Sequence, residues 1–536
     1  INRHRQRGDP GGMRGLVLPL LLALATGRVS DEWIDPDTPE SARTRSIQGV
    51  EHVLVFSDEF EVEGRTFKDG DDPVWTGLNG LVNTNEQYNA YNDTLAYTKN
   101  GKLVLKASSR DYVFPPEPEQ VRHYQTPMLQ TWNKFCFTEG FIELSAQMPG
   151  KSSTGGLWPA FWMMGNLGRA TLQDSTDRIW PFNFDECPSD ADKRANQYGT
   201  QALDACTNGV GRGAPEIDIV ETMPGSFVYD YQAKIDDGRC PAVDAGTLDR
   251  IKTRQPFVCT SLQAAPGWPD DAIQRPTLGC LPANWTDSDG SSQPEYYPEF
   301  YPSPDAFGSI YGTDYDVAIN YEFYGDRYAP GGQTLHTDAF SACTMLDPTH
   351  FEEQHRWQAE WRAGEGGFVR FTLDDKLQFN VPGESVTRHR FVSFPDGESG
   401  TMLSREIPEE PMYMILNIDL APLWGWNFCD ASKCNCCEDC KRSECTTCME
   451  EDENGDLVNT RAWLAELCAQ LPADYEIDYV RVYQRPGEER VGCDPADHPT
   501  AQFIHDHADR YTPWDRDRPL KPVVVGGGAC DPEDSG

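Results

Sequence analysis

The chain has 536 residues, with 46 Lys and Arg against 86 Asp and Glu, so its formal net charge is −40. This acidity excludes sequence-independent nucleic-acid binding, which needs Lys and Arg to displace phosphate counterions, and it opposes docking to anionic lipid. Aromatic residues make up 11% of the chain and supply ample material for a folded core. An acidic, aromatic-rich protein suits neutral polymers whose flat faces stack on rings, and we therefore expect a sugar-binding protein.

Near the N-terminus, Met13 and Arg14 precede the apolar run Leu16–Ala25, which ends in a small-residue pattern and is followed by polar residues. These features are typical of a secretory signal peptide. The run is too short to cross a bilayer, which takes about 20 apolar residues. We expect residues 1–30 to be a signal peptide or a short hydrophobic segment. The mature protein would then be lumenal, extracellular or in the cell wall, and membrane-associated only if this segment is uncleaved.

The 17 cysteines agree with an oxidising compartment. They crowd in residues 429–448, and this segment has two interpretations. Two CxxC pairs between Cys437 and Cys448 could supply thiolate ligands to zinc, whereas in a secreted protein the same density more often means a disulfide-stapled loop. The compartment favours disulfides, but their pairing cannot be deduced from the sequence. Two sequons, at Asn92 and Asn284, are candidate glycosylation sites.

Long amphipathic helices are scarce, whereas short alternating or aromatic-rich runs bounded by Gly, Pro, Asn and Asp recur along the chain. Such short strands with frequent turn residues indicate an all-β sandwich or barrel. In chain order, the expected strands are His52–Phe56, Lys102–Ala107, Gly140–Gln147, Gly156–Gly165, Glu216–Val220, Phe368–Leu373, Met412–Asp419 and Tyr475–Tyr483. Between them, the Pro- and Asp-rich stretches at about 170–212, 230–312 and 427–470 are expected to be surface insertions.

The most informative segment is the hexapeptide EIDIVE, which begins at Glu216. On a strand, Glu216 and Asp218 share one face, whereas Ile217 and Ile219 share the other. Glu221 would point to the opposite face unless the strand holds one extra residue, and a β-bulge, common beside active sites, supplies that shift. With the bulge, three carboxyl groups share one surface, and their mutual repulsion raises at least one pKa. Two carboxyl groups about 5 Å apart are the arrangement of a retaining glycosidase, in which one attacks the anomeric carbon and the other is acid and base.

An isolated motif of this kind is more often an exposed edge strand with solvated acids, or a Ca²⁺ site. Here the apolar alternation buries one face of the strand, so the acids occupy the other face of a curved sheet. Upstream, the strand expected over Gly156–Gly165 places Trp158 and Trp162 on one face. These two side chains either pack in the core or stack on pyranose rings in a cleft.

The ordered series of motifs resembles glycoside hydrolase family 16 over residues 53–485. The series consists of FSDEF from Phe56, GFIE from Gly140, EIDIVE from Glu216, HRWQAEW from His355, MILN from Met414 and DYVRVYQ from Asp478. Within that family the chain is most similar to the fungal and algal beta-glucan-synthesis-associated proteins. This closer similarity rests on the segment Met128–Phe137, on GNLGR and IWPF downstream of it, and on a tail that begins with CDP at Cys493.

The resemblance implies an all-β, concanavalin-like β-sandwich, or jelly roll, with a concave substrate cleft and long loop insertions. It also implies that Glu216 is the nucleophile, that Asp218 supports it and that Glu221 is the acid and base. A linker at 31–52 would precede this domain, and the tail at 486–536 would pack on it or be partly disordered. Candidate substrate-binding residues are Trp132, Asn133, Trp158, Trp162, Arg169, Trp180, Trp424 and Trp426, with core packing as the alternative role of the tryptophans.

We expect a retaining β-glucan-active glycosidase or transglycosylase that takes part in β-1,6- or β-1,3-glucan biosynthesis or remodelling and in cell-wall organisation. One alternative is an endo-β-1,3-glucanase of the laminarinase type. Another is a non-catalytic lumenal glucan-binding assembly factor, although such a factor has no need of three acids that repel one another. The expected partner is a β-glucan polysaccharide or oligosaccharide, and not nucleic acid. No cofactor is expected; a structural Ca²⁺ is compatible with the resemblance, but no metal ligands can be named.

Overall fold

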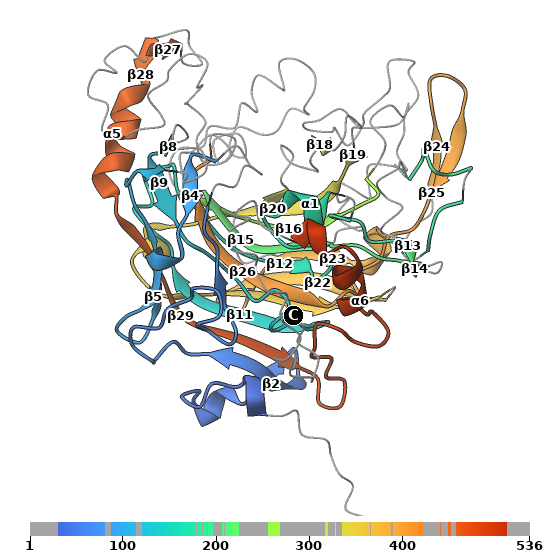
Figure 1. Cartoon of the computed structure of the whole chain (residues 1–536), viewed down its shortest axis with the longest axis horizontal. Coiled ribbons are helices and arrows are strands. Elements are labelled where there is room, and N and C mark those ends of the chain that lie inside the picture. Colours follow the sequence, from blue (N-terminus) through green and yellow to red (C-terminus); the bar gives the residue numbers. More distant parts are fainter. Residues whose placement is uncertain are drawn as a thin grey trace, which may run out of the picture.

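The computed structural model describes residues 31–80, 87–113, 121–177, 179–184, 186–189, 191–196, 206–207, 210–223, 256–267, 317–319, 327–328, 335–364, 366–386, 390–421, 440, 449–451 and 457–511. Within these ranges, two large antiparallel sheets, one of nine strands and one of eight, form the body of the molecule. Figure 1 shows them as two layers, with the eight-stranded sheet above the nine-stranded one. The two layers confirm the predicted all-β sandwich.

The nine-stranded sheet joins strands from both ends of the chain. Its order is β1 (Thr44–Ile47), β2 (Val50–Asp58), β29 (Ala473–Gln484), β11 (Gly140–Gln147), β21 (His355–Arg362), β22 (Phe368–Leu373) and β23 (Lys376–Pro382), and β29 also pairs with β6 (Leu103–Ala107), which pairs with β5 (Ala96–Thr98). The last strand of the sandwich, β29, is therefore central to this sheet, which ties the C-terminal part of the domain to its beginning.

The eight-stranded sheet carries the predicted site. Its order is β17 (Val317–Ile319), β20 (Asp338–Met345), β16 (Phe257–Ala264), β15 (Glu216–Met223), β12 (Trp158–Gly165), β26 (Met412–Asp419), β10 (Met128–Gln130) and β3 (Thr76–Gly77). The strand that carries the EIDIVE motif, β15, is thus an interior strand with a neighbour on each side.

Shorter elements surround the two sheets. They are the strand pairs β4 (Asn89–Tyr91) with β9 (Tyr124–Thr126), β7 (Tyr112–Val113) with β8 (Val121–Arg122), β13 (Cys206–Thr207) with β14 (Val210–Gly211), β18 (Arg327–Tyr328) with β19 (Leu335–His336), β24 (Arg390–Ser393) with β25 (Ser399–Met402) and β27 (Met449–Glu451) with β28 (Leu457–Asn459), the helices α1 (Gln173–Thr176), α5 (Thr460–Gln470) and α6 (Ala501–Asp506), and short 3₁₀ turns that include η3 (Asp93–Leu95) and η8 (Ala508–Tyr511).

Alternation along the strands builds the core between the sheets. On β12 and β26, Phe161, Met163, Leu416 and Ile418 are fully buried and belong to one large apolar cluster. Their neighbours along each strand point to the other face, because successive side chains of a strand alternate. Burial on one face fixes the register, since a slip by one residue would turn every apolar side chain out of the core.

All eight strands expected from the sequence are present, and three of them have the predicted bounds, namely β11, β22 and β26. Two expectations are wrong. Residues 31–52 are not a linker, because they include β1 and the start of β2 in the nine-stranded sheet. The stretch 230–312 is not only a surface insertion, because it contains β16, which pairs with β15 and with β20.

The first part of the predicted tail packs on the domain. We call residues 486–511 the C-terminal tail; it contains α6 and η8, and a disulfide between Cys136 and Cys493 fastens it to the sandwich. Its Ile504 is buried. The remaining residues of the chain, 512–536, lie outside the described ranges.

Two further disulfides agree with the oxidising compartment expected from the sequence. Cys259 pairs with Cys343 across two neighbouring strands, and Cys440 pairs with Cys468 of α5. Cys440 belongs to one of the two CxxC pairs considered for zinc, and its disulfide speaks against that role. The other cysteines of the 429–448 segment lie outside the described residues, as do the N-terminal apolar run and the sequon at Asn284. Among the helices described, none has the length and apolar character that crossing a bilayer demands.

We predict that Phe161→Ala lowers the stability of the domain by about 3–5 kcal/mol, because it removes a fully buried ring and leaves a cavity between the sheets. Phe391→Ala is the matched control, since Phe391 lies on the β24 hairpin and is 61% exposed. Thermal unfolding of both variants measures the difference. An equal melting temperature for the two would contradict the assignment of Phe161 to the core.

Candidate active site

The register of β15 contains the bulge predicted from the sequence. Against β12, Phe161 pairs with Val220 whereas Trp162 pairs with Asp218, so Ile219 has no partner of its own. The pairing with β16 shifts at the same place, between Asp218 and Glu221. The extra residue shifts the alternation of side chains by one position, and Glu221 therefore projects from the same side of the strand as Asp218.

Glu216 is buried and accepts hydrogen bonds on both carboxylate oxygens. The Trp180 indole nitrogen donates to Oε2 at 2.7 Å, and the Gln263 side-chain amide donates to Oε1 at 2.7 Å. Donors on both oxygens fix the plane of the carboxylate and favour its ionised form.

Asp218 lies next to Glu216 on β15, and its side-chain donors belong to the neighbouring strand β16. The Ser261 hydroxyl donates to Asp218 Oδ2, and Gln263 Nε2 reaches the same oxygen at 3.1 Å. One amide group therefore bridges Glu216 and Asp218, and the two carboxyl groups also share a hydrogen bond with each other. The arrangement holds both acids in one geometry.

Glu221 differs from the other two acids because it is only half-buried. It lies opposite the small side chain of Ala160 on one side and opposite Cys259 on the other. Cys259 is joined to Cys343 of the next strand, so a buried disulfide lies beside Glu221. The most accessible acid of the three is thus the one predicted to exchange protons with substrate.

Burial controls the ionisation of the two inner acids. It raises the pKa of Glu216 well above its usual value, and the charges of Asp218 and Glu221 raise it further, although the Trp180 donor opposes them. Burial also raises the pKa of Asp218 to about 6, against the donors Ser261 and Gln263. The Glu216–Asp218 pair therefore retains a proton close to neutral pH.

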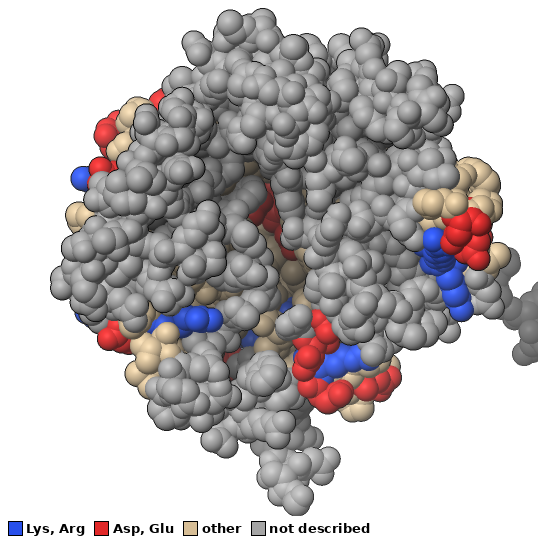
Figure 2. Space-filling view, turned by 90° about the horizontal axis from the view of Figure 1, so that it is seen from above, with Lys and Arg blue, Asp and Glu red and all other residues tan. Residues whose placement is uncertain are grey.

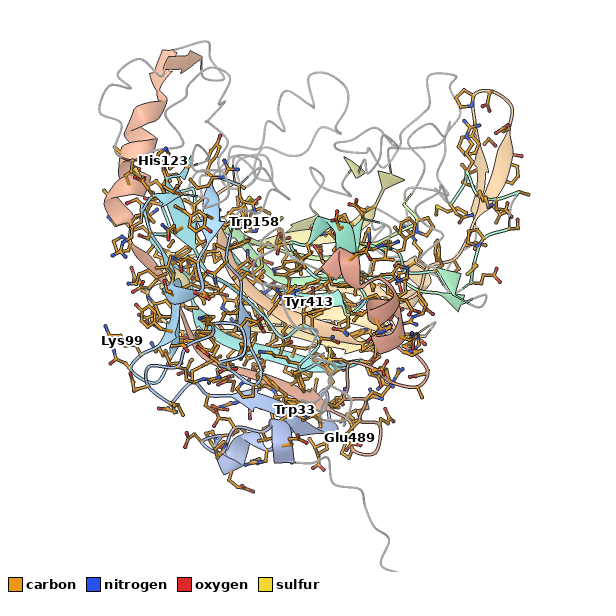
Figure 3. The ribbon with its side chains drawn as sticks, viewed as in Figure 1. Trp33, Lys99, His123, Trp158, Tyr413 and Glu489 are labelled. Carbon is orange, nitrogen blue, oxygen red and sulfur yellow. A yellow bond between two sulfur atoms is a disulfide. The ribbon has the colours of Figure 1, made fainter. Side chains whose placement is uncertain are left out.

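Aromatic side chains lie on the same face. Trp162 is half-buried and lies two residues after Ala160 on β12, so the two side chains share one face of the sheet. Its indole nitrogen donates a hydrogen bond to Asn417 Oδ1 at 2.8 Å. Trp158 and Trp180 are also half-buried. Figure 3 labels Trp158, which pairs in register with Asp419 near one end of these strands, and Tyr413, which lies near the other end. These three tryptophans keep the exposure that a sugar platform needs.

A buried polar network fixes the orientation of Trp162. Asn417, which accepts its indole hydrogen, donates to Asp419 Oδ2 at 3.3 Å. Asp419 also accepts hydrogen bonds from Tyr91 at 2.7 Å and from Asn89 at 3.0 Å. Burial raises the pKa of Asp419 to about 6. We assign this network to holding the indole in one plane above the sheet.

Three predicted substrate-binding residues have a different role in the structure. Trp132 is buried, its ring stacks on Tyr511 with centroids 5.5 Å apart, and the Arg169 guanidinium lies 4.6 Å from its centroid. Asn133 is also buried and accepts a hydrogen bond from Asn166. Burial lowers the pKa of Arg169 to about 10. The prediction of sugar contacts for Trp132, Asn133 and Arg169 is therefore corrected to packing beneath the C-terminal tail, while Trp424 and Trp426 lie outside the described residues.

Ser261 and Gln263 are not among the site residues predicted from the sequence, because their segment lies in a stretch expected to be an insertion. The run FVCTSL at 257–262 is rich in β-branched and aromatic residues, and this composition was the available signal for a strand. Which residues stand opposite the acids follows only from the pairing of β15 with β16.

The site lies on the face of the eight-stranded sheet that points away from the core. Figure 2, which views the molecule from above, shows acidic side chains near the middle of this side of the molecule. Among the residues that the structure describes, no group of three or more His, Cys, Asp or Glu side chains is arranged to hold a metal ion. The structural Ca²⁺ considered from the sequence stays a prediction without ligands.

Comparisons with known proteins identify relatives of the whole domain. The family model described as beta-glucan synthesis-associated protein SKN1/KRE6/Sbg1 matches residues 21–228 and 459–517. The chain is 30% identical over 504 residues to the beta-glucan synthesis-associated protein KRE6 of Candida albicans, covering 89% of this chain and 52% of that protein. It is 28% identical over 520 residues to the KRE6 protein of Saccharomyces cerevisiae, covering 92% of this chain and 54% of that protein. The chain thus spans about half the length of the curated relatives it matches.

Among solved structures, the endo-beta-1,3-glucanase from Pyrococcus furiosus aligns with a TM-score of 0.38 and 15% identity, covering 83% of this chain and 98% of that chain. The laminarinase catalytic domain from Thermotoga maritima aligns with a TM-score of 0.37 and 16% identity, covering 81% of this chain and 98% of that chain.

We predict that Asp218→Asn removes a pH-dependent loss of stability. A carboxyl group whose folded pKa of about 6 exceeds its unfolded value near 3.9 stabilises the fold at low pH, and this contribution is lost as the pH rises through about 6. The asparagine is isosteric and has no charge to bury, so the variant should gain on the order of 2 kcal/mol over wild type at pH 8 and nothing at pH 3.5.

The measurement is the melting temperature of both proteins from pH 3.5 to 8. Glu352→Gln, at an exposed position, controls for the loss of one negative charge. A difference between Asp218→Asn and wild type that does not change with pH would refute the buried, proton-retaining pair.

Proposed function

Because this chain belongs to the beta-glucan synthesis-associated SKN1/KRE6/Sbg1 family, we propose that it is a retaining, β-glucan-active glycosidase or transglycosylase. Its role would be in the synthesis or remodelling of β-1,3- and β-1,6-glucan and in cell-wall organisation. The observation that carries the proposal is the trio Glu216, Asp218 and Glu221 on one face of the bulged strand β15. A retaining mechanism requires two such carboxyl groups, one to attack and one to transfer protons.

In the first step, a carboxylate oxygen of Glu216 attacks the anomeric carbon while the bond to the leaving sugar breaks. Glu221 gives its proton to the departing oxygen, so a glycosyl ester on Glu216 and a free hydroxyl are formed. In the second step Glu221, now ionised, takes the proton of a water or sugar hydroxyl, whose oxygen displaces Glu216 from the anomeric carbon. The ester bond to Glu216 is broken and Glu221 is protonated again, so the site returns to its starting state.

The hydrogen bonds around the inner pair support the assignment of roles. Glu216 needs to be ionised to attack, and Trp180 and Gln263 donate to its two oxygens. The donors Ser261 and Gln263 both reach Oδ2 of Asp218, which leaves its other oxygen to hold the proton shared with Glu216. The hydrogen bond between the two acids raises the pKa of Glu216 and lowers that of Asp218, so the retained proton belongs to Glu216 in the free site. Transfer of this proton to the other oxygen of Asp218 leaves Glu216 ionised for the attack.

Whether water or sugar resolves the ester depends on how well the neighbouring subsites hold an acceptor. Trp162 and Trp158 are half-buried and lie on the same face as the acids, which supports binding of pyranose rings beside them. The three disulfides in the described part of the chain support a place in the secretory pathway, in the lumen, outside the cell or in the cell wall.

We predict transfer products when the purified protein is incubated with laminarin oligosaccharides and a fluorescently labelled glucan acceptor. Because a bound sugar competes with water for the ester, labelled products longer than the acceptor should accumulate, and chromatography with mass analysis measures them. Free reducing ends without longer labelled products would identify an endo-hydrolase of the laminarinase type instead. Neither product, together with tight glucan binding, would indicate a non-catalytic assembly factor.

We predict that substitutions of Glu216 and of Glu221 respond differently to the leaving group. Glu216→Gln should lower turnover of every β-glucoside substrate by at least about 10³-fold, because the nucleophile is lost. Glu221→Gln should lower turnover of glucan by about 10²–10⁴-fold but spare ester formation from an activated aryl β-glucoside, whose leaving group needs no proton. Steady-state and burst kinetics on both substrates distinguish the variants. Equal losses on the two substrates for Glu221→Gln would contradict its role as the acid.

A further inference from the structure

We propose that the C-terminal tail, residues 486–511, positions the nucleophile by holding in place the loop that carries Trp180 and the segment that leads into Glu216. This inference rests on the function proposed above for Glu216 and extends it to a part of the chain outside the sandwich. The tail contacts Arg212, which precedes Glu216 in the chain, and its own Tyr511 contacts the loop that carries Trp180, the hydrogen-bond donor to Glu216. Each step is a contact between described residues.

The tail is anchored at its start. The disulfide between Cys136 and Cys493 joins it to the segment after β10. Thr500 donates to the backbone oxygen of Cys493 and accepts a hydrogen bond from Asn166 at 3.1 Å. Asp494 accepts from the Thr500 backbone nitrogen at 2.7 Å. These bonds fix the tail on the domain before α6 begins.

The first contact toward the site is made by Arg212, four residues before Glu216. Its guanidinium forms a buried, bidentate ion pair with Glu410, in which Nη2 donates to Oε2 at 2.8 Å. Its Nη1 atom donates to the backbone oxygen of Pro499, in the tail, at 3.1 Å. Glu410 also accepts from the backbone nitrogen of Gly213 at 3.4 Å. A buried guanidinium that lost its tail partner would have to move or remain unsatisfied, since polar groups out of water need their hydrogen bonds.

The second contact is made by Tyr511 at the end of the tail. Its hydroxyl donates to the backbone oxygen of Leu167, and its ring stacks on Trp132. Leu167 belongs to the loop between β12 and Trp180. Ile504 of α6 packs in the same apolar cluster as Ile179 and as Phe182 of that loop. The tail therefore covers the loop on which Trp180 is carried.

The loop and the segment before β15 are in direct contact with each other. The backbone nitrogen of Ala214 donates to the oxygen of Ile179 at 2.9 Å. A Cβ atom on Gly213 would lie 2.1 Å from the backbone oxygen of Phe182, so only glycine allows this approach. Movement of one segment must therefore displace the other. Trp180 follows Ile179 in the chain, and its hydrogen bond of 2.7 Å to Glu216 Oε2 connects the loop to the carboxylate.

Figure 1 shows the same relation at the level of elements: the helices of the tail, in red, lie beside α1 and against the end of the eight-stranded sheet. A tail that served only to cover apolar surface would need the stacking of Tyr511 and the burial of Ile504, but not the two polar bonds. The hydroxyl of Tyr511 and the Nη1 bond of Arg212 are therefore the features to test.

The test uses the whole chain with two conservative variants, Tyr511→Phe and Arg212→Lys. Tyr511→Phe keeps the ring stacked on Trp132 and removes one hydrogen-bond donor. Arg212→Lys keeps a positive charge opposite Glu410 and loses the bidentate geometry. Matched controls are Tyr475→Phe and Arg370→Lys in the nine-stranded sheet, where Tyr475 is buried and Arg370 pairs with Glu360 at 2.9 Å. Laminarin oligosaccharides are the substrate, and melting temperatures confirm that each variant folds.

We expect Tyr511→Phe and Arg212→Lys to lower kcat by about three- to tenfold with KM within about twofold, because the loss of one hydrogen bond loosens the reacting group and not the sugar platforms. The Trp180 bond lowers the pKa of Glu216. Its loosening should therefore move the acid limb of kcat/KM to higher pH, by about half a unit. The control variants should show neither change. A kcat and an acid limb equal to those of the controls would overturn the proposal.

Hydrogen exchange separates failure of this inference from failure of the proposed function. Faster exchange in peptides that span 176–184 and 210–218, in both tail variants and in neither control, is expected whether or not the protein turns over glucan. If the wild type is inactive but this exchange pattern is found, the enzymatic function fails and the positioning of Glu216 by the tail stands. Unchanged exchange in both peptides overturns the positioning role even if the wild type is active.

Discussion

The arrangement of the site depends on the single extra residue in β15. In a regular strand, side chains alternate strictly, and Glu221 would point into the core between the sheets together with Ile217. There an ionised carboxyl group would be surrounded by apolar side chains, and burying a charge in such surroundings is costly. The bulge at Ile219 turns Glu221 to the outer face and leaves Val220 in the core. The same irregularity thus protects the packing of the sandwich and brings a third acid to the site.

Bringing three acids together creates an electrostatic cost that the neighbouring strand reduces. Glu216 and Asp218 are buried, and the charge of Asp218 raises the pKa of Glu216, whereas a hydrogen bond from Glu216 lowers that of Asp218. Gln263 and Ser261 of β16, with Trp180 from the loop, supply donors that favour the ionised forms and fix the two carboxyl groups in place. The result is a compromise in which the pair keeps a proton near neutral pH.

The sequence was sufficient for the architecture and for the acids, because both leave a periodic signal. Alternation identified β11, β22 and β26, and the break in alternation at Glu221 identified the bulge. It was not sufficient for partners that meet only through pairing. Ser261 and Gln263 lie in a strand framed by Pro-rich stretches, and nothing local in 257–264 points to Glu216. For a tryptophan, residue type cannot distinguish stacking on sugar from stacking on protein: Trp162 keeps one accessible side, whereas Trp132 is covered by Tyr511.

The covering of Trp132 also changes the meaning of the motif around it. Residues 128–137 and the tail are separate family features in the sequence, but in the structure Cys136 and Cys493 are bonded and Trp132 and Tyr511 stack. The two segments are therefore one structural unit, and loss of either exposes the apolar surface of the other. That unit contacts Arg212 and the loop of Trp180, so residues that follow the last strand of the sandwich bear on the surroundings of Glu216, the proposed nucleophile. A domain cut at the end of β29 would keep every acid of the trio and lose part of what holds Glu216 in place.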